Sequence, residues 1–341
     1  MPISIRARAP LRISFAGGGT DVPPFPQREG GLVLNATIDR YAYGLLRPRR
    51  DRQVRIESAD FGLSVNYQVD EAPIFDGRLD LVKAAIRRLG DPAAPGYDIF
   101  LHSNAPPGSG LGSSSTVMVT LIGLLKDHHN LALTDYEIAQ LSHHIERVDM
   151  AMLGGMQDQY AATFGGFNFI EFGADHVIVN PLRVSADVVN ELEHNMLLCY
   201  TGATRRSDGV IEDQTARYEG GESGTLAALR GQKQLAVEMK NALVRRRPRE
   251  FGDLLHEAWR QKKRMSPKIS TEFIDTAYAE ARRAGALGGK VTGAGGGGYM
   301  LFYCEFQKKH RVAEALTRLG GAVTEFAFEA DGLTTWSMDD G

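Results

Sequence analysis

The alternation of apolar and polar positions predicts a first half that is rich in strands. Apolar and charged residues alternate from Ile3 to Arg8, which is the spacing of a half-buried strand. We expect further strands at residues 11–16, 33–35, 41–46, 54–57, 63–67 and 97–102, and a helix at 79–89. Prolines at positions 23, 24 and 26 argue against a helix between the first strands.

Helical spacing dominates after residue 112. Residues 113–130 are expected to form one helix, and Thr134 opens the next, because Glu137 completes a capping-box pattern. The second helix has an apolar stripe with a spacing of three or four residues, formed by Ile138, Leu141, Ile145, Val148 and Met152. Two glycines at 154 and 155 end it.

The second half repeats the mixture of helix and strand. We expect a domain boundary within about 181–193 and a polar loop or the start of a helix at 204–224. The remaining elements are expected as strands at 196–201, 299–305 and 323–329 and helices at 226–244, 250–265, 271–284 and 308–319. The pattern predicts an α+β chain with mixed sheets, divided into residues 1–185 and 186–341.

Composition narrows the class of protein. The 341 residues are 43% apolar and 24% charged, and the net charge of −3 gives no sign of a nucleic-acid partner. Cys199 and Cys304 lie in apolar surroundings and are expected to be free thiols of a reducing compartment. We expect no membrane span, because no apolar run approaches about 20 residues, and no signal peptide, so the cytoplasm is the expected location.

A glycine-rich loop supplies the clearest chemistry. Residues 106–116 read PPGSGLGSSST and run directly into an apolar helix. Glycine lets backbone N–H groups approach a ligand closely, and a helix N-terminus adds unpaired N–H groups. This combination is typical of a phosphate-binding loop. The residues predicted to bind phosphate are Pro107, Gly108, Ser109, Gly110, Leu111, Gly112, Ser113, Ser114 and Ser115.

Other phosphate-binding loops fit less well. A Walker loop requires Gly-Lys-Ser/Thr, whereas Ser113 follows Gly112 here, and the protein-kinase motifs H-R-D and D-F-G are absent. Glycines 293, 295 and 298 satisfy G-x-G-x-x-G, but a strand follows them where a dinucleotide-binding fold requires a helix.

Three motifs together resemble the GHMP small-molecule kinases, which include galactokinase, homoserine kinase and mevalonate kinase. They are APLRISFAGGGTD at 9–21, PPGSGLGSSST at 106–116 and KVTGAGGGGYML at 290–301. The resemblance implies an N-terminal domain like ribosomal protein S5 domain 2, a C-terminal ferredoxin-like domain and an active site between them. It also implies ATP as co-substrate, with Mg²⁺ as cofactor.

Within this family the chain most resembles the kinases of D-glycero-D-manno-heptose 7-phosphate. The resemblance lies in PLRISFAGGGTDVPPF, in NATIDRYAY at 35–43 and in GGMQDQYAATFGGFN at 154–168. Galactokinases carry G-E-H-T-D where this chain has G-G-G-T-D. The expected reaction phosphorylates the anomeric hydroxyl to give a 1,7-bisphosphate. Alternatives are a kinase for an unphosphorylated sugar such as L-fucose or galactose, or a sugar sensor without activity, and a homodimer is a further possibility.

The resemblance also implies roles for single residues. Asp158 matches the carboxylate that faces the attacking hydroxyl, and Arg12 matches the first-motif arginine. Ser114 and Glu146 match the metal ligands. The structural alternatives are an Asp158 that caps a helix, an Arg12 in an exposed ion pair, and a solvated Glu146 balanced by Arg147.

Acceptor binding is predicted at the two outer glycine motifs. Gly18, Gly19, Thr20 and Asp21 are expected to bind sugar hydroxyls, with an Asx-type turn as the alternative. Backbone N–H groups of Gly295 and Gly296 are expected to close on the substrates. Arg205, with Arg206 as a weaker candidate, is expected to hold the acceptor's phosphate. The basic runs at 245–249 and 262–264 are interpreted as solvated helix faces, with a polyanion contact as the alternative.

Overall fold

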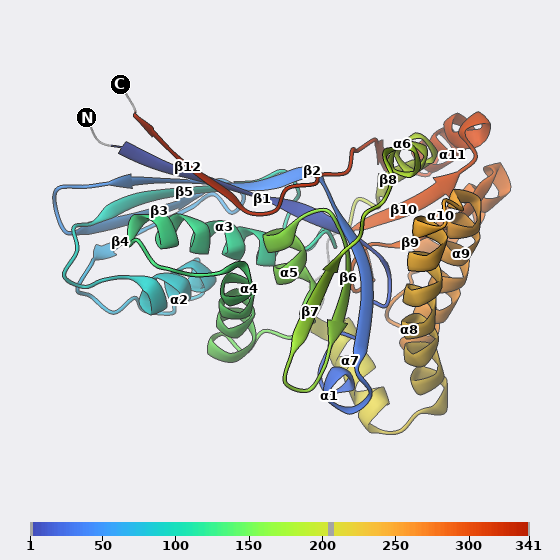
Figure 1. Cartoon of the computed structure of the whole chain (residues 1–341), viewed down its shortest axis with the longest axis horizontal. Coiled ribbons are helices and arrows are strands. Elements are labelled where there is room, and N and C mark those ends of the chain that lie inside the picture. The colour runs from blue at the N-terminus through green and yellow to red at the C-terminus, as the bar shows by residue number, and fades with distance from the viewer. Residues whose placement is uncertain (1–2, 204–207, 340–341) are drawn as a thin grey trace.

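The molecule consists of two sheets with helices packed against them (Figure 1). The structure is a computed structural model and describes residues 3–203 and 208–339. The larger sheet has eight strands with the order β12-β1-β2-β5-β3-β4, and β6 and β7 continue from β2. All its pairings are antiparallel except that of β3 with β5. Its strands are β1 (Ile3–Ala16), β2 (Gly31–Pro48), β3 (Gln53–Ser58), β4 (Leu63–Gln68), β5 (Tyr97–Ser103), β6 (Phe167–Phe172), β7 (Val177–Pro181) and β12 (Thr334–Asp339).

Helices cover one face of this larger sheet, below it in the view of Figure 1. The most apolar is α3, whose residues from Met118 to Leu125 are all buried. It is hydrophobic nearly all round because it lies between the sheet and the other helices. The helices of this half are α1 (Phe25–Glu29), α2 (Asp80–Leu89), α3 (Ser113–His128), α4 (Asp135–His144), the π-helical turn η1 (Ile145–Asp149) and α5 (Gln157–Phe164).

The smaller sheet is fully antiparallel, with the order β11-β8-β10-β9. Its strands are β8 (Met196–Tyr200), β9 (Ala286–Val291), β10 (Tyr299–Cys304) and β11 (Ala322–Thr324). The helices of this half are α6 (Ala186–Asn195), α7 (Asp208–Glu219), α8 (Ser223–Val244), α9 (Pro248–Met265), α10 (Glu272–Ala284) and α11 (Phe306–Arg318). No helix in the two described ranges is long and apolar enough to cross a membrane.

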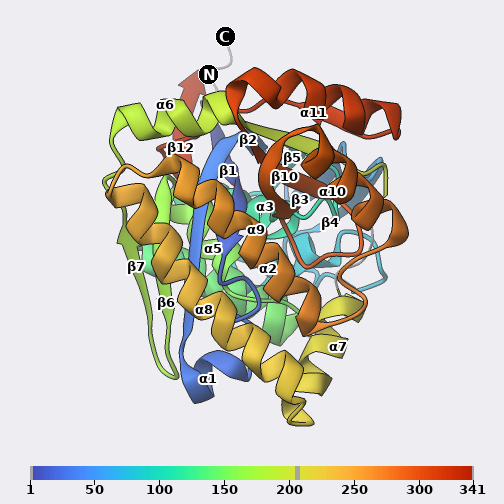
Figure 2. The same ribbon diagram turned by 90° about the vertical axis from the view of Figure 1, so that its right-hand side faces the viewer.

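A shared apolar core joins the two halves. Helices α8 and α9 lie in front of β1 and β2 in Figure 2. Phe15 of β1 packs edge-on against Phe251 of α9, with ring centroids 5.1 Å apart, and Leu34 and Met239 are buried in the same cluster. The burial of these apolar side chains stabilises the packing of α8 and α9 against the first sheet. A site between the halves is therefore held from both sides.

Several elements differ from the sequence-based expectations. Helix α1 forms despite its prolines, because Pro26 lies in the first turn, where its missing N–H would have no helical partner. Helix α6 occupies the expected boundary, and α7 shows that the segment expected as a loop or the start of a helix is helical over Asp208–Glu219. The stripe of the second helix is broken by η1, which leaves Val148 61% exposed. The capping box of Thr134 and Glu137 is present as predicted.

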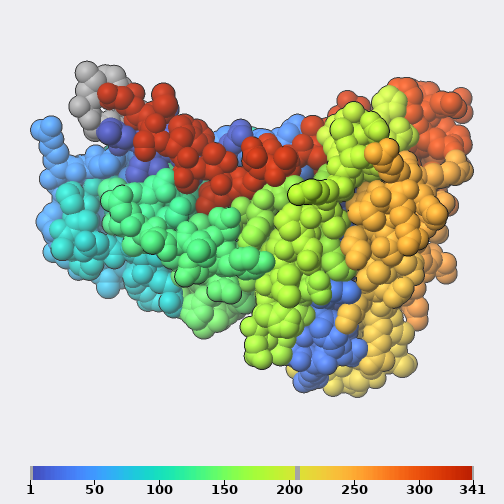
Figure 3. All heavy atoms as spheres, viewed as in Figure 1, coloured from blue at the N-terminus to red at the C-terminus, as the bar shows by residue number. Residues whose placement is uncertain are grey.

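The end of the chain returns to the first sheet. Strand β12, which the sequence pattern did not indicate, pairs with β1 from Ile3↔Asp339 to Arg8↔Thr334. The expected strand at 323–329 is reduced to β11, and the following residues run back along the first half, in red in Figures 1 and 3. A division of the chain at residue 185/186 therefore places β12 in the second segment, although this strand belongs to the sheet of the first.

Candidate active site

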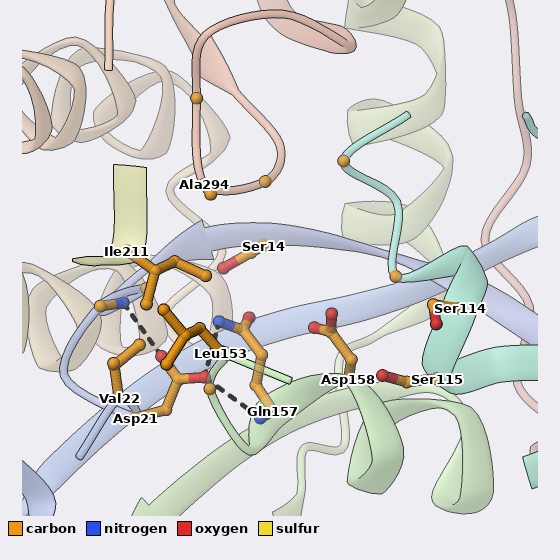
Figure 4. A pocket seen from close by; sticks show the side chains of 18 of the residues that line it. Ser14, Asp21, Val22, Ser114, Ser115, Leu153, Gln157, Asp158, Ile211 and Ala294 are labelled. Carbon is orange, nitrogen blue, oxygen red and sulfur yellow. Dashed lines mark hydrogen bonds between the residues drawn. The ribbon is translucent and has the colours of Figure 1, made fainter. Parts of the chain in front are cut away.

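A cavity lies where the two halves meet, and all three glycine motifs contribute to its wall. Figure 4 shows Asp158 in its middle, with Ser114 and Ser115 on one side and Asp21, Gln157, Leu153 and Ile211 on the other. Residues of α7, α9 and β9 complete the wall. The cavity thus has a side at the start of α3 and a side at the first glycine motif.

The loop before α3 has the backbone of an anion-binding loop. Gly108, Gly110 and Gly112 have φ values of 75°, 82° and 79°, which L side chains rarely adopt. Among the described residues, no side chain caps the start of α3 at Ser113, and residues 113–115 line the cavity. Such an N-terminus attracts an anion.

Only part of the predicted phosphate loop reaches the cavity. Its lining includes Gly108, Gly110, Gly112 and residues 113–115. Pro107, Ser109 and Leu111 are not on the wall, and the last two are buried beneath the loop. These residues shape the loop from behind, since the Leu111 carbonyl accepts the backbone N–H of Arg12 at 3.1 Å.

The third glycine motif packs backbone to backbone against the second. The N–H of Tyr299 donates to the Ser109 carbonyl at 2.8 Å, and a Cβ on Gly298 would lie 2.3 Å from the same oxygen. Gly295 lines the cavity, but Gly296 does not, and its N–H donates to the Ile269 carbonyl at 2.8 Å. The prediction that the Gly296 N–H binds substrate is therefore not supported, because that donor is already used.

Arg12 and Asp158 form a buried ion pair at the centre of the cavity. Arg12 Nε and Nη2 each lie 2.7 Å from Asp158 Oδ1, and the Arg12 side chain is 6% exposed. Its Nη1 donates to the Gly110 carbonyl at 2.6 Å and to the Thr292 carbonyl at 3.3 Å. The arginine is therefore not in an exposed ion pair, and it ties both glycine loops to the carboxylate.

The second oxygen of Asp158 is free for another partner. Oδ2 accepts no hydrogen bond from residues 3–203 or 208–339, and a Cβ on Gly112 would lie 3.4 Å from it. Asp158 does not cap α5 either, because Asp21 occupies that position and accepts the N–H groups of Met156 and Gln157 at 3.1 Å. A carboxylate fixed through one oxygen, with the other in a cavity, can accept a proton.

Some residues of the first glycine motif line the cavity, and others hold the loop in place. Asp21 also accepts the Gly19 N–H at 3.0 Å and Gln157 Nε2 at 3.1 Å, so its carboxylate holds the loop against α5. Gly18, Gly19 and Asp21 line the cavity. Thr20 does not, because its hydroxyl donates to the Gly17 carbonyl at 2.7 Å inside the turn. Thr20 therefore supports the turn from inside, whereas sugar binding by Gly18, Gly19 and Asp21 stays a prediction.

Glu146 is buried at the side of the cavity near α3 and is not a solvated residue. It is 1% exposed, Ser115 Oγ donates to its Oε2 at 2.9 Å, and Arg147 Nη2 lies 3.1 Å from the same oxygen. Burial raises the pKa of Glu146, while Arg147 and Ser115 lower it. The π-helical turn η1 carries this carboxylate, as such turns often do at functional sites.

The predicted metal ligands meet the needs of Mg²⁺ only in part. Ser114 and Glu146 both line the cavity, although the hydroxyl that contacts Glu146 is that of Ser115. The described part of the chain contains no cluster of three or more histidine, cysteine or acidic residues that could hold a metal. One carboxylate and one hydroxyl fit Mg²⁺ when phosphate oxygens supply the other ligands.

Two buried lysines of the cavity escaped the sequence-based prediction. Lys290 is 2% exposed and donates to the Ser14 carbonyl at 2.6 Å, and Lys262 is 4% exposed. The basic run at 262–264 is therefore not wholly solvated. Lys262 lies on the buried stripe of α9, three residues from both Trp259 and Met265, and this spacing was the available signal. Arg205 and Arg206, predicted for the acceptor's phosphate, lie outside the described residues.

Fold and site together define a kinase that acts on a small molecule. Family models described as GHMP kinases N terminal domain and GHMP kinases C terminal match residues 80–166 and 239–322. A D-glycero-alpha-D-manno-heptose 7-phosphate kinase of Campylobacter jejuni is 38% identical over 98% of this chain and 99% of that protein. The chain belongs to the GHMP kinases, which confirms the predicted family and fold.

Solved structures agree with this assignment. A D-glycero-D-manno-heptose 1-phosphate kinase from Bacteroides thetaiotaomicron is 36% identical, covers 98% of this chain and 100% of its own, and has a TM-score of 0.83. A galactokinase from Lactococcus lactis, in complex with galactose, has a TM-score of 0.78 at 21% identity and covers 97% and 95% of the two chains. At that identity the second likeness shows the fold alone.

Proposed function

We propose that the protein transfers the γ-phosphoryl group of ATP to the anomeric hydroxyl of D-glycero-D-manno-heptose 7-phosphate, giving the 1,7-bisphosphate. The observation that carries the proposal is the Arg12–Asp158 pair, which lies between an anion-binding loop and a second, polar side of the cavity. The similarity to the heptose 7-phosphate kinase of C. jejuni supports the substrate class.

The side of the cavity at α3 is assigned to ATP. The N–H groups of the 108–112 loop and of the start of α3 bind its phosphates, and Gly295 closes on them from the other half. Phosphoryl transfer depends mainly on positioning and charge neutralisation. Arg12 serves both purposes, because it is fixed by three acceptors and carries a permanent positive charge.

Mg²⁺ is assigned to Ser114 and Glu146, next to the phosphate loop. The ion would supply charge neutralisation at the phosphates of ATP. The buried carboxylate of Glu146 supports this assignment, because its pKa is raised by burial and a bound cation would favour its ionised form. Ser115 and Arg147 fix the orientation of the carboxylate.

The opposite side is assigned to the sugar. Oδ2 of Asp158 accepts or orients the proton of the attacking hydroxyl, and an anomeric hydroxyl is acidic enough for a carboxylate to suffice. Gly18, Gly19 and Asp21 form the wall against which the sugar binds, and Gln157 offers a side-chain amide beside them. Arg205 stays a sequence-based prediction for the acceptor's phosphate.

The test is ADP release with Mg·ATP and a panel of acceptors: heptose 7-phosphate, free heptose, L-fucose, galactose, mannose and mevalonate. We expect turnover with heptose 7-phosphate at a kcat/KM at least tenfold above the others. Phosphorus NMR then locates the new phosphate on the anomeric oxygen. Faster turnover with an unphosphorylated sugar would agree with the kinase mechanism but contradict the proposed substrate. ATP binding without turnover on any acceptor would favour the sugar-sensor alternative.

A further inference from the structure

The cavity wall carries four carboxylates, those of Asp21, Glu146, Asp158 and Asp208, but only two of its cations form ion pairs with them among the described residues. The wall carries Arg12, Arg147, Lys262 and Lys290. Arg12 pairs with Asp158 and Arg147 pairs with Glu146. The two lysines have no carboxylate within ion-pair distance among the residues that the structure describes.

Lys262 is the least satisfied of these groups. An ammonium carries three N–H donors, and Lys290 uses one on the Ser14 carbonyl at 2.6 Å. Lys262 makes no hydrogen bond or ion pair within residues 3–203 and 208–339, although only 4% of it is exposed. Burial of an unpaired charge is costly, so a ligand that supplies an anionic oxygen would gain strongly here.

The electrostatics agree with this geometry. Burial lowers the pKa of Lys262 to about 8, Asp21 opposes that shift, and Arg12 adds to it. Asp21 cannot act as a full partner, because its carboxylate already accepts four N–H groups from Gly19, Met156 and Gln157. An anion that binds at this point would stabilise the charged ammonium, whose ordinary pKa Asp21 alone does not restore.

The position of α9 places Lys262 on the side of the cavity assigned to the acceptor. Met265 follows it by one helical turn, and a Cβ on Gly19 would lie 2.3 Å from the Met265 methyl carbon. Gln214 and Ile211 of α7 line the same region, and Gln214 Nε2 donates to the Gly19 carbonyl at 3.3 Å. Lys262 therefore lies on the part of the cavity wall next to the first glycine motif.

We propose that Lys262 is a substrate-binding residue whose ammonium binds a phosphoryl oxygen. The inference rests on the proposed kinase function and adds a residue from the C-terminal half to it. Phosphoryl oxygens form charge-assisted hydrogen bonds with an ammonium and thus match its charge and its free donors. They have two sources in this reaction, the phosphate that the acceptor already carries and the γ-phosphoryl group of ATP.

The test compares Lys262→Met with Lys263→Met. Methionine keeps the length of the side chain and removes the charge. Lys263 is the adjacent residue on α9, is exposed and pairs with Asp275 at 3.1 Å, so its variant controls for a lost surface charge. Steady-state kinetics with heptose 7-phosphate and free heptose, at varied ATP, separate the two sources. Calorimetric binding of each acceptor without ATP gives the same comparison without turnover.

If Lys262 binds the acceptor's phosphate, Lys262→Met raises the KM or Kd of heptose 7-phosphate at least tenfold and leaves free heptose and ATP within twofold. If it binds the γ-phosphoryl group, kcat falls at least tenfold with either acceptor. Lys262→Arg restores part of the loss in both cases, because it restores the charge. Values within twofold of the wild type for every parameter would overturn the proposal.

Thermal unfolding separates binding from structural support. We expect the melting temperature of unliganded Lys262→Met to equal or exceed that of the wild type, because an unpaired buried charge is removed. A lower melting temperature together with lost activity would mean that the lysine supports the fold, and would also overturn the proposal. A wild-type protein without turnover on any heptose would instead refute the proposed function.

Discussion

At the scale of single residues, the carboxylates of the cavity differ in how many of their oxygens already accept hydrogen bonds. Asp21 and Asp158 lie on the same wall, yet Asp21 accepts four N–H groups and Asp158 has one oxygen without a hydrogen-bond partner in the described ranges. Only the second can take a proton without releasing part of the fold. The free hydrogen-bonding capacity of a side chain thus separates a chemical role from a structural one.

Replacement of Asp158 by asparagine should abolish most of the activity. The amide keeps the size of the side chain but cannot accept a proton, so we expect kcat to fall by about 10²–10⁴-fold with little change in ATP affinity. The measurement is steady-state ADP release together with calorimetric ATP binding. Asp187→Asn is the matched control, because that side chain is 83% exposed and lies outside the cavity. Asp158→Asn with a kcat near that of the wild type would refute the proton-acceptor role.

Activity should also depend on pH through Lys262. Its pKa of about 8 lies below the ordinary value of 10.5, so the unliganded enzyme loses this positive charge as pH rises through 8. We expect kcat/KM for the phosphorylated acceptor to fall above about pH 8, because the neutral amine no longer attracts a phosphate. Asp21, Arg12 and Lys290 face the same ammonium, and only Asp21 favours its charged form.

Stability should change in the opposite direction in the same interval. Between about pH 8 and 10.5 the unfolded chain still binds the proton that the folded chain has lost, so this group makes the free energy of unfolding rise with pH. The measurement is a pair of profiles, kcat/KM and thermal unfolding, for the wild type and Lys262→Arg. A wild-type kcat/KM profile that is flat from pH 7.5 to 9.5, or identical to that of the arginine variant, would contradict the assignment.

At the scale of elements, the second and third glycine motifs act as one unit. Each supplies backbone to the other, and Arg12 donates to carbonyls of both at Gly110 and Thr292. The two motifs come from different halves, so their contact couples the loop before α3 to the position of the smaller sheet. The glycines are needed for this close approach as well as for positive φ.

Gly298→Ala should therefore weaken both the fold and ATP binding. The residue has φ +83°, and its new Cβ would lie 2.3 Å from the Ser109 carbonyl oxygen. We expect a loss of about 1–3 kcal/mol in the free energy of unfolding and at least a fivefold rise in the KM of ATP. Denaturant unfolding and ATP titration measure the two effects. Gly224→Ala is the control, since a Cβ there meets nothing within 4 Å, and equal behaviour of the two variants would exclude the interlocked loops.

The elements also show what the sequence could predict and what it could not. The αL glycines, the capping box and the helix after the loop are set by neighbouring residues, so local pattern was sufficient. The pairing of β12 with β1 and the burial of Lys262 depend on contacts far apart in the chain. Asp21 and Thr20 belong to one motif, and only the packing of α5 against it decides which of them faces the cavity.

At the scale of the whole molecule, the two halves share structure at two places. The cluster that contains Phe15 and Leu34 also contains Met239 and Phe251, so this core is built from residues of both halves. Strand β12 then brings the last residues back to β1. The Arg12–Asp158 pair lies near this junction, because Arg12 and Phe15 are on the same strand. Movement of one half relative to the other would therefore disturb both the core and the site.

The full chain should consequently unfold in a single cooperative transition. If the halves were independent, Met239→Ala in α8 would destabilise only the second of two transitions. Because Met239 is fully buried in the shared cluster, we expect one transition whose midpoint moves down as a whole, with a loss of about 2–5 kcal/mol in the free energy of unfolding. Differential scanning calorimetry measures this, and agreement between the calorimetric and van't Hoff enthalpies is the criterion.

Leu121→Ala, in the separate core under the first sheet, is the matched comparison and should lower the same transition. Two transitions that respond separately to the two variants would mean that the halves fold independently, and that the Arg12–Asp158 geometry depends on their docking and not on one common fold.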